Sequence, residues 1–340
     1  MFKSYFSLDY NFIFNQLNGF FARWGLNKED DPFMAPAPEI LDIEISTICH
    51  GINNKPCQFC YKGNTGQGVN MSIETYRWIF QKINTKVLTQ AAFGIGDISS
   101  NPDLEKILQH TRANGIVPNI TINGARMTPY YYDMLANLCG AVSVSFYGDN
   151  SVCYNACHEL LKRGVQTNIH VLVSNETVDW CWEVLSDFKK DKRLKGLNAV
   201  VFLHLKKKGR GSQFDKMKEK DYNKLMNYAY KNNVKIGADT CGASYVAQYF
   251  KDKPNFEDVK KSIESCCSGR FSGYINVKGV FFPCSFSEGE QEWVEGFDLL
   301  DESIKDIRDI WKNKKMDIWR DRLRKACDEN GCVKCPIHEV

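Results

Sequence analysis

The sequence has no run of about eighteen apolar residues, so it contains no candidate for a membrane-spanning helix. Residues 1–23 alternate between aromatic and polar side chains and lack a compact apolar stretch before a small-residue cleavage site, so no secretory signal peptide is expected. The net charge is only +3 over 340 residues, which gives no reason to expect a nucleic-acid partner. These absences predict a cytoplasmic protein whose thiols stay reduced.

Cysteine, by contrast, is abundant, and the chain has 14 of them. Disulfides are rare in reducing compartments, so clustered cysteines there indicate metal or redox ligands. Most of the cysteines fall into three groups, and the others are single or loosely paired. The three groups are the first group (Cys49, Cys57 and Cys60), the second group (Cys266, Cys267 and Cys284) and the third group (Cys327, Cys332 and Cys335).

Predicted strands and helices alternate over residues 39–245, which indicates an α/β fold with a parallel sheet and crossover helices. The alternation is enough for a partial or a full barrel. Residues 1–38 are predicted to be an N-terminal extension. Residues 246–340 are predicted to be a smaller module with a hairpin over 271–276 and 280–283 and a helix over 304–326. The predicted barrel strands cover 40–45, 87–93, 117–122, 141–146, 166–173, 200–205 and 234–238.

The first group stands in the order Cys-x7-Cys-x2-Cys, directly after the first predicted barrel strand. Three thiolates on one loop can hold three irons of a [4Fe–4S] cluster and leave the fourth iron open to a ligand from outside the protein. A zinc site is the alternative, with Cys57 and Cys60 as one half and Cys332 and Cys335 as the other.

A glycine-rich turn, Gly94-Ile95-Gly96-Asp97, follows the second predicted strand. Its glycines let a ligand approach the backbone, and its carboxylate can pair with an ammonium group. Ligands of a parallel barrel sit at the carboxyl ends of the strands, so this turn and Cys49 are expected at the same end.

Together these features resemble the radical S-adenosylmethionine (SAM) superfamily. The resemblance implies a partial TIM barrel, (β/α)6, in which the first group holds a [4Fe–4S] cluster and the amino and carboxylate groups of SAM bind its open iron. One electron then splits SAM into methionine and a 5′-deoxyadenosyl radical. The resemblance also implies that Gly94, Gly96 and Asp97 bind the methionine amino group and that Phe59 lies near the adenine. One departure is the spacer between the first two cysteines, which has seven residues instead of the usual three.

Two further SAM contacts are carried over from the family, at Asn123 and at Ser145. Asn123 ends the third predicted strand and Ser145 lies on the fourth. The alternative interpretations are an ordinary turn at Asn123-Gly124 and packing of Ser145 inside the barrel.

The C-terminal cysteines resemble the twitch module, a shortened SPASM domain found after radical SAM barrels. This implies an auxiliary [4Fe–4S] cluster on Cys266, Cys284, Cys332 and Cys335, with Cys267 as a substitute for Cys266 and Cys327 as a spare. A zinc knuckle that stabilises a small module is the alternative.

Two other features have both a functional and a structural interpretation. Cys241, after the last predicted barrel strand, is a candidate catalytic thiol that donates hydrogen to a radical or contacts substrate; otherwise it is a buried thiol. The basic loop over residues 205–211 suits an anionic substrate group and equally a solvated charge run.

The sequence therefore predicts a radical SAM enzyme, an oxidoreductase or a peptide-modifying enzyme, that acts with an electron donor such as flavodoxin or ferredoxin. A peptide is the first candidate substrate, and a small-molecule dehydrogenase or a nucleotide-modifying enzyme is the alternative. A non-catalytic zinc or iron–sulfur protein is the hypothesis from another class. No membrane or nucleic-acid partner is expected.

Overall fold

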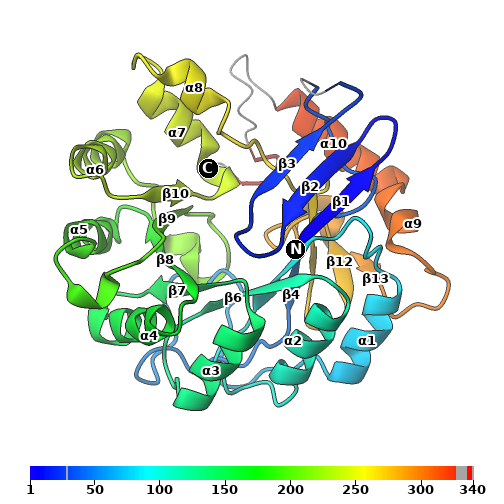
Figure 1. The fold of residues 1–340 in the computed structure, drawn as a ribbon, viewed down its shortest axis with the longest axis horizontal. Helices are drawn as coiled ribbons and strands as arrows, with labels where there is room; N and C mark the ends of the chain where they lie inside the picture. Colours follow the sequence, from blue (N-terminus) through cyan, green and yellow to red (C-terminus); the bar gives the residue numbers. More distant parts are fainter. Residues whose placement is uncertain (28–29, 327–334, 339–340) are drawn as a thin grey trace.

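The computed structural model describes residues 1–27, 30–326 and 335–338 of the chain, and Figure 1 shows their arrangement. The N-terminal residues form a three-stranded antiparallel sheet of β1 (Phe2–Phe6), β2 (Asn11–Asn15) and β3 (Phe21–Trp24). Phe12 and Phe14 of this sheet are buried in one cluster with Val87, Val117 and Phe271, which lie at or just before the starts of β5, β6 and β11. The predicted extension is thus a folded unit that covers the amino-terminal ends of the main strands.

The main sheet has ten strands in the order β10-β9-β8-β7-β6-β5-β4-β11-β12-β13. From β10 to β11 every neighbouring pair is parallel, whereas β12 and β13 are antiparallel to their neighbours. The mixed α/β class with a large parallel sheet is therefore confirmed. The strands are β4 (Ile40–Glu44), β5 (Gln90–Gly94), β6 (Val117–Ile122), β7 (Ala141–Phe146), β8 (Gln166–Val173), β9 (Ala199–His204), β10 (Ile236–Ala238), β11 (Ser272–Ile275), β12 (Val280–Phe282) and β13 (Phe297–Asp298).

Six helices connect consecutive parallel strands, and in Figure 1 they lie along the outer side of the sheet. They are α1 (Ile73–Gln81), α2 (Leu104–Ala113), α3 (Pro129–Leu138), α4 (Asn150–Lys162), α5 (Val178–Asp187) and α6 (Glu219–Lys231). The remaining helices are α7 (Ala243–Phe250), α8 (Phe256–Lys260), α9 (Ile307–Trp311) and α10 (Lys314–Lys325), with short 3-10 helices η1 (Lys192–Leu194), η2 (Gly209–Gln213), η3 (Thr240–Gly242) and η4 (Gln291–Trp293). Within the described ranges, none of the helices is both long and apolar enough to cross a bilayer.

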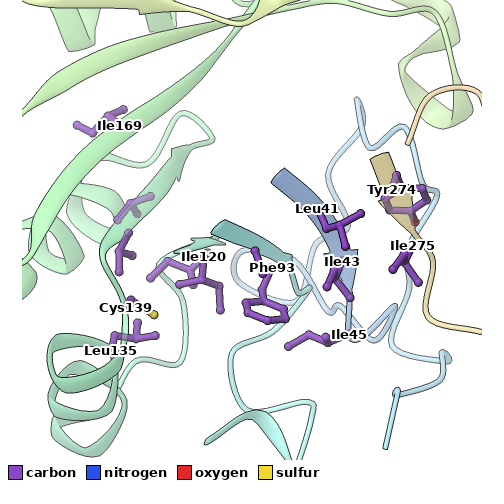
Figure 2. Close-up of a cluster of buried hydrophobic side chains, with 14 of the residues drawn as sticks. Leu41, Ile43, Ile45, Phe93, Ile120, Leu135, Cys139, Ile169, Tyr274 and Ile275 are labelled. Atoms are coloured by element: carbon purple, nitrogen blue, oxygen red, sulfur yellow. The ribbon is translucent and has the colours of Figure 1, made fainter. Parts of the chain in front are cut away.

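The core lies between the sheet and these helices. Figure 2 shows Ile43, Phe93 and Ile120 from neighbouring strands packed together, with Leu135 of α3 nearby. Ile275 of β11 pairs in register with Ile43 of β4, so the predicted C-terminal hairpin extends the same sheet and shares its core. Side chains of successive strand residues alternate between the two faces of the sheet. Ser145 and His170 therefore belong to the face opposite the one that packs against the helices.

Two sequence-based boundaries are wrong for identifiable reasons. The helix predicted over 304–326 is two helices, because the side chain of Asn313 accepts from the backbone N–H of Lys315 and caps a new helix start. The sequence also suggests Asn101 and Pro102 as N-cap and first-turn residues of the next helix, but the N-cap of α2 is Asp103. Asn101 lies just before it: its Oδ1 accepts from the backbone N–H of Asp103 at 2.9 Å, and its side-chain amide donates to the carbonyls of Ile45 at 2.7 Å and Met71 at 3.0 Å.

Candidate functional site

The loop between β4 and α1 carries the first group, and its backbone path is tightly fixed. Ile48 forms a bridge with Thr65, and the backbone N–H of Cys49 donates to the Thr65 carbonyl at 2.8 Å. Gly51 has a φ of 73°, in the left-handed region, and a Cβ atom there would overlap the Lys55 carbonyl. The long spacer between Cys49 and Cys57 therefore begins with a turn that requires glycine.

The three thiols of the first group lie within electrostatic reach of one another, and all three are partly buried. Burial raises the pKa of the Cys57 thiol to about 12, and the charges of Cys49 and Cys60 add to the shift. Burial is also the main reason why the pKa of Cys49 is raised. Thiolates are stabilised when they bind iron, so three thiols gathered on one loop fit a cluster held on three ligands.

In the part of the chain that the structure describes, no three His, Cys, Asp or Glu side chains converge on a point where they would hold a single metal ion. A [4Fe–4S] cluster requires a different arrangement, because each thiolate binds its own iron.

Asp97 is buried at 2% exposure, and both of its carboxylate oxygens already have partners. Oδ2 accepts from the backbone N–H of His50 at 3.0 Å and lies 2.6 Å from its Nδ1. Oδ1 accepts from Arg126 at 2.9 Å and from Asn123 at 3.3 Å. Arg126 also donates to Asn54 at 2.6 Å, inside the spacer of the first group. These contacts make Asp97 an anchor for the cysteine loop, and its contact with the SAM amino group stays a prediction.

The two glycines of the predicted SAM turn have different surroundings. A Cβ atom on Gly96 would overlap the Ile48 carbonyl and the Cβ of Cys49, so this position lets the turn approach the cysteine loop. A Cβ atom on Gly94 would have its nearest neighbour, the Cα of Glu44, at 3.8 Å. Gly94 is also exposed, so it leaves space beside the strand ends, whereas Gly96 fixes the packing of the loop itself.

The other predicted SAM contacts line the same end of the sheet. Phe59 lies among aromatic rings, with centroid distances of 5.1 Å to Tyr147, 5.5 Å to Trp180 and 6.1 Å to Phe214. Asn123 donates to the Gly96 carbonyl at 3.2 Å and also hydrogen-bonds the Cys49 thiol. Both residues are therefore grouped with the first cysteines, and their contacts with SAM stay predictions.

Sequence reasoning missed two residues beside this site, Tyr147 directly after β7 and His170 on β8. Burial raises the pKa of Tyr147, and the charges of all three thiols of the first group contribute, so its hydroxyl faces them. That hydroxyl is hydrogen-bonded to Ser145, the predicted SAM contact. His170 is the register partner of Ser145 on the same sheet face. Burial lowers the pKa of His170 to about 4, so its imidazole is neutral near pH 7.

The basic loop over residues 205–211 has internal partners, which neither sequence interpretation foresaw. Arg210 Nε donates to the Cys57 carbonyl at 2.8 Å, and its Nη2 donates to the Asn64 carbonyl at 3.0 Å. The Arg210 backbone N–H donates to the Cys60 carbonyl at 3.0 Å. Gly209 has a φ of 56° and approaches the backbone of Cys60 and Tyr61 so closely that a Cβ would overlap it. The loop therefore fixes the backbone of the Cys57–Cys60 segment.

The segment after Cys60 also reaches the C-terminal part of the chain. The ring of Tyr61 lies 4.3 Å from that of Phe286, and Tyr61 is hydrogen-bonded to Ser285. Lys62 donates to the hydroxyl of Tyr274 at 2.8 Å and forms an ion pair with Glu288. The loops that carry Cys60 and Cys284 are therefore in direct contact.

The cysteines of the second group have different surroundings. Burial raises the pKa of Cys284 to about 12, and the charges of Cys266 and Cys335 add to the shift, so these three thiols lie within electrostatic reach of one another. Cys267 points elsewhere, and its sulfur lies 3.1 Å from the Ser272 hydroxyl. Among the predicted auxiliary ligands, Cys332 lies outside the described residues, as does the spare Cys327. Burial is the main cause of the raised pKa of the candidate catalytic thiol, Cys241, and the charges of Cys266 and Cys284 add to the shift.

A scan against protein-family models finds no match for this chain, and a search of curated proteins also finds none. Solved structures do match. SuiB of Streptococcus suis bound to the precursor peptide SuiA has 12% sequence identity and a TM-score of 0.67, over 93% of this chain and 89% of that chain. SuiB bound to S-adenosylmethionine has 14% identity and a TM-score of 0.64, over 89% of this chain and 74% of that chain. Native anSMEcpe with bound AdoMet and the Cp18Cys peptide has 16% identity and a TM-score of 0.57, over 83% and 82%. The shared fold agrees with the resemblance to the radical SAM superfamily.

Proposed function

We propose that this protein is a radical SAM enzyme that modifies a peptide. The main observation behind this proposal is that one loop after β4 carries Cys49, Cys57 and Cys60. Asn123, Tyr147 and Gly96 surround these three thiols. The fold shared with structures that bind SAM supports this proposal. The (β/α)6 partial barrel, with the N-terminal sheet before it and a twitch module after it, is part of the same proposal.

Cys49, Cys57 and Cys60 would hold a [4Fe–4S] cluster, which with SAM bound would supply one-electron cleavage of SAM and, through it, removal of hydrogen from the substrate. The residues of this chain bind, orient and shield these groups. Arg210 and Arg126 hold the loop of the first group from two sides. Phe59 and its neighbouring rings form an apolar wall for the adenine, and Gly94 leaves room at the end of β5 for the methionine part of SAM.

The peptide substrate is supported by the two matched proteins, because SuiB was solved with the precursor peptide SuiA and anSMEcpe with the Cp18Cys peptide. We place an auxiliary [4Fe–4S] cluster on Cys266, Cys284 and Cys335, with a fourth position that the sequence assigns to Cys332. The proposal includes an external one-electron donor such as flavodoxin or ferredoxin, and a cytoplasmic location.

The test is anaerobic purification and reconstitution, followed by iron and sulfide analysis and incubation with SAM and dithionite. About eight irons per chain are expected from two four-iron clusters, together with formation of 5′-deoxyadenosine. Cys57→Ala should abolish this product. Cys153→Ala, which removes a buried thiol of α4 outside all three groups, should retain it. A colourless zinc protein that forms no 5′-deoxyadenosine would disprove the proposal.

A further inference from the structure

A cavity of about 430 Å³ lies beside the loop of the first group, next to helices α3 and α4. Ligand sites in proteins are commonly about 300–1,000 Å³ in volume, so this cavity is large enough to hold a small molecule or a short segment of a chain. Gly51, Asn53 and Asn54 line one side of it, and all three belong to the spacer between Cys49 and Cys57. The seven-residue spacer, which is longer than the usual three residues, therefore helps to form this cavity.

The backbone that lines the cavity has an uncommon conformation. Asn53, Asn54 and Arg126 have φ angles of 52°, 58° and 56°, all in the left-handed region. They are three of the five non-glycine residues with a positive φ in the part of the chain that the structure describes. Residues in such sparsely populated regions cluster at ligand sites, where the surrounding contacts hold them in place. Arg126 supplies these contacts, because its guanidinium donates to the Gly51 carbonyl at 3.4 Å and to Asn54 Oδ1 at 2.6 Å.

The charges at the cavity are already paired. Arg126 is the only charged residue among those that line it, and its guanidinium donates to the carboxylate of Asp97 at 2.9 Å. Asp149, just before α4, accepts from the hydroxyl of Ser151 at 2.6 Å and from its backbone N–H at 3.0 Å. A strongly charged ligand would therefore meet no unpaired opposite charge here, which favours a neutral ligand.

The polar groups that remain unpaired are neutral donors. Oδ1 of Asn54 accepts from Arg126 at 2.6 Å, and Oδ1 of Asn155, on α4, accepts from Arg193 at 3.0 Å. These bonds occupy the two amide oxygens, whereas neither amide NH2 group donates to any residue that the structure describes. Each NH2 group can therefore donate to an acceptor on a ligand, and the carbonyl oxygens of a peptide chain are neutral acceptors of this kind.

We propose that this cavity binds a segment of the peptide substrate. Carbonyl oxygens of the segment would accept from the amides of Asn54 and Asn155, and its side chains would contact Met127 and Val152, which also line the cavity. This inference rests on the proposed function. The segment would flank the residue that is modified, because α3 and α4 lie on the outer side of the sheet. A peptide bound there would contact the spacer of the first group, so its binding would also stabilise the loop that carries the three cysteines.

The probe is a fluorescently labelled peptide, selected from a displayed library of random peptides on the reconstituted full-length protein with SAM bound. Its Kd is measured by fluorescence anisotropy for each variant, and iron content is measured alongside so that loss of a cluster is not mistaken for loss of binding. Asn54→Asp and Asn155→Asp keep the acceptor oxygen for the arginines but replace the NH2 donor with a carboxylate oxygen. Each should raise the Kd about three- to tenfold, the effect of losing one neutral hydrogen bond. Aspartate also tolerates the left-handed φ at position 54.

A second variant, Asn155→Trp, tests the cavity itself, because an indole at this exposed position should fill the space and abolish binding. The peptide should slow the chelator-driven loss of iron from the first cluster of the wild-type protein but not of Asn155→Trp. Asn150→Asp is the matched control, since Asn150 is an exposed residue of the same helix whose amide donates to Glu183 at 2.9 Å outside the cavity. Its Kd should equal that of the wild-type protein.

An unchanged Kd in Asn54→Asp, Asn155→Asp and Asn155→Trp would overturn the peptide site, as would equal weakening by Asn150→Asp. Selection of no peptide by a protein that holds iron and cleaves SAM would also overturn it and leave the radical SAM chemistry standing. Absence of iron from the wild-type protein, or no cleavage of SAM by it, would instead overturn the proposed function.

Discussion

The aromatic rings of Tyr61 and Phe286 lie 4.3 Å apart, and they join the loop that follows Cys60 to the loop that follows Cys284. Tyr61 is the first residue after the first group, and Phe286 also lies over the ammonium of Lys206. The two cysteine sites are therefore packed against each other and are not independent appendages of the fold.

This contact predicts that the two sites stabilise each other. In a double-mutant cycle of Tyr61→Leu and Phe286→Leu, the coupling energy should be about 0.5–1.5 kcal/mol, as for other packed aromatic pairs. The measurement is the free energy of activation for loss of the iron–sulfur absorbance in the presence of a chelator. Strictly additive effects of the two substitutions would show that the rings do not couple the loops. A control cycle with Tyr61→Leu and Phe250→Leu should be additive, because no contact joins those rings in the described structure.

Alanine substitutions at Gly96 and Gly94 should affect assembly of the first cluster differently. Gly96→Ala should displace the Ile48 carbonyl and the Cys49 Cβ, so the first cluster should fail to assemble and about four irons should be lost. Gly94→Ala should keep about eight irons, because its new methyl group meets nothing closer than 3.8 Å. Iron content and SAM cleavage are measured for both variants. Equal iron content in the two would contradict the packing role of Gly96.

Arg210 is predicted to be a positioning residue for the first group. Arg210→Ala removes the donors to the carbonyls of Cys57 and Asn64 and also the positive charge that lowers the pKa of the Cys57 thiol. Losing hydrogen bonds from a charged group costs about 1.5–3 kcal/mol, so iron should leave the first cluster roughly ten- to a hundredfold faster. The rate is followed by chelation. Lys207→Ala is the control, since Lys207 forms an exposed ion pair with Asp215 and should release iron like the wild-type protein.

The buried carboxyl of Glu39 predicts a pH dependence of stability. Burial, the largest cause, raises its pKa from 4.5 to about 7, against the opposing effects of Arg23 and of the hydrogen bond from Tyr10. Between these pH values the folded state keeps a proton that the unfolded chain has released, so stability falls as the pH rises from 4.5 to about 7. The melting temperature of Glu39→Gln should vary less with pH over this interval.

Glu264→Gln is the control for this effect, because Glu264 contacts the same Arg23 at 3.0 Å but its side chain is 60% exposed. Its melting temperature should follow that of the wild-type protein across the interval. Parallel curves for wild type and Glu39→Gln would show that the Glu39 carboxyl does not take up the proton.

The α/β class, the positions of most strands and helices, and the spacing of the cysteines could all be predicted from the sequence. These properties depend on local periodicity and on residue type, which are readable along the chain. The helix boundary at Asn313 was wrong because a single side-chain hydrogen bond, from the Lys315 backbone N–H to Asn313, starts a new helix at a point that the periodicity does not mark.

The residues that surround the cysteines became apparent only from the folded chain. Arg126 and Arg210 lie far from the first group along the chain, so no local pattern distinguishes them from solvated charges. Cys267 shows the same limit, because it adjoins Cys266 in sequence but its sulfur lies 3.1 Å from the Ser272 hydroxyl. Such contacts arise because the parallel sheet brings the ends of distant strands together. Local sequence patterns do not indicate which distant residues meet there.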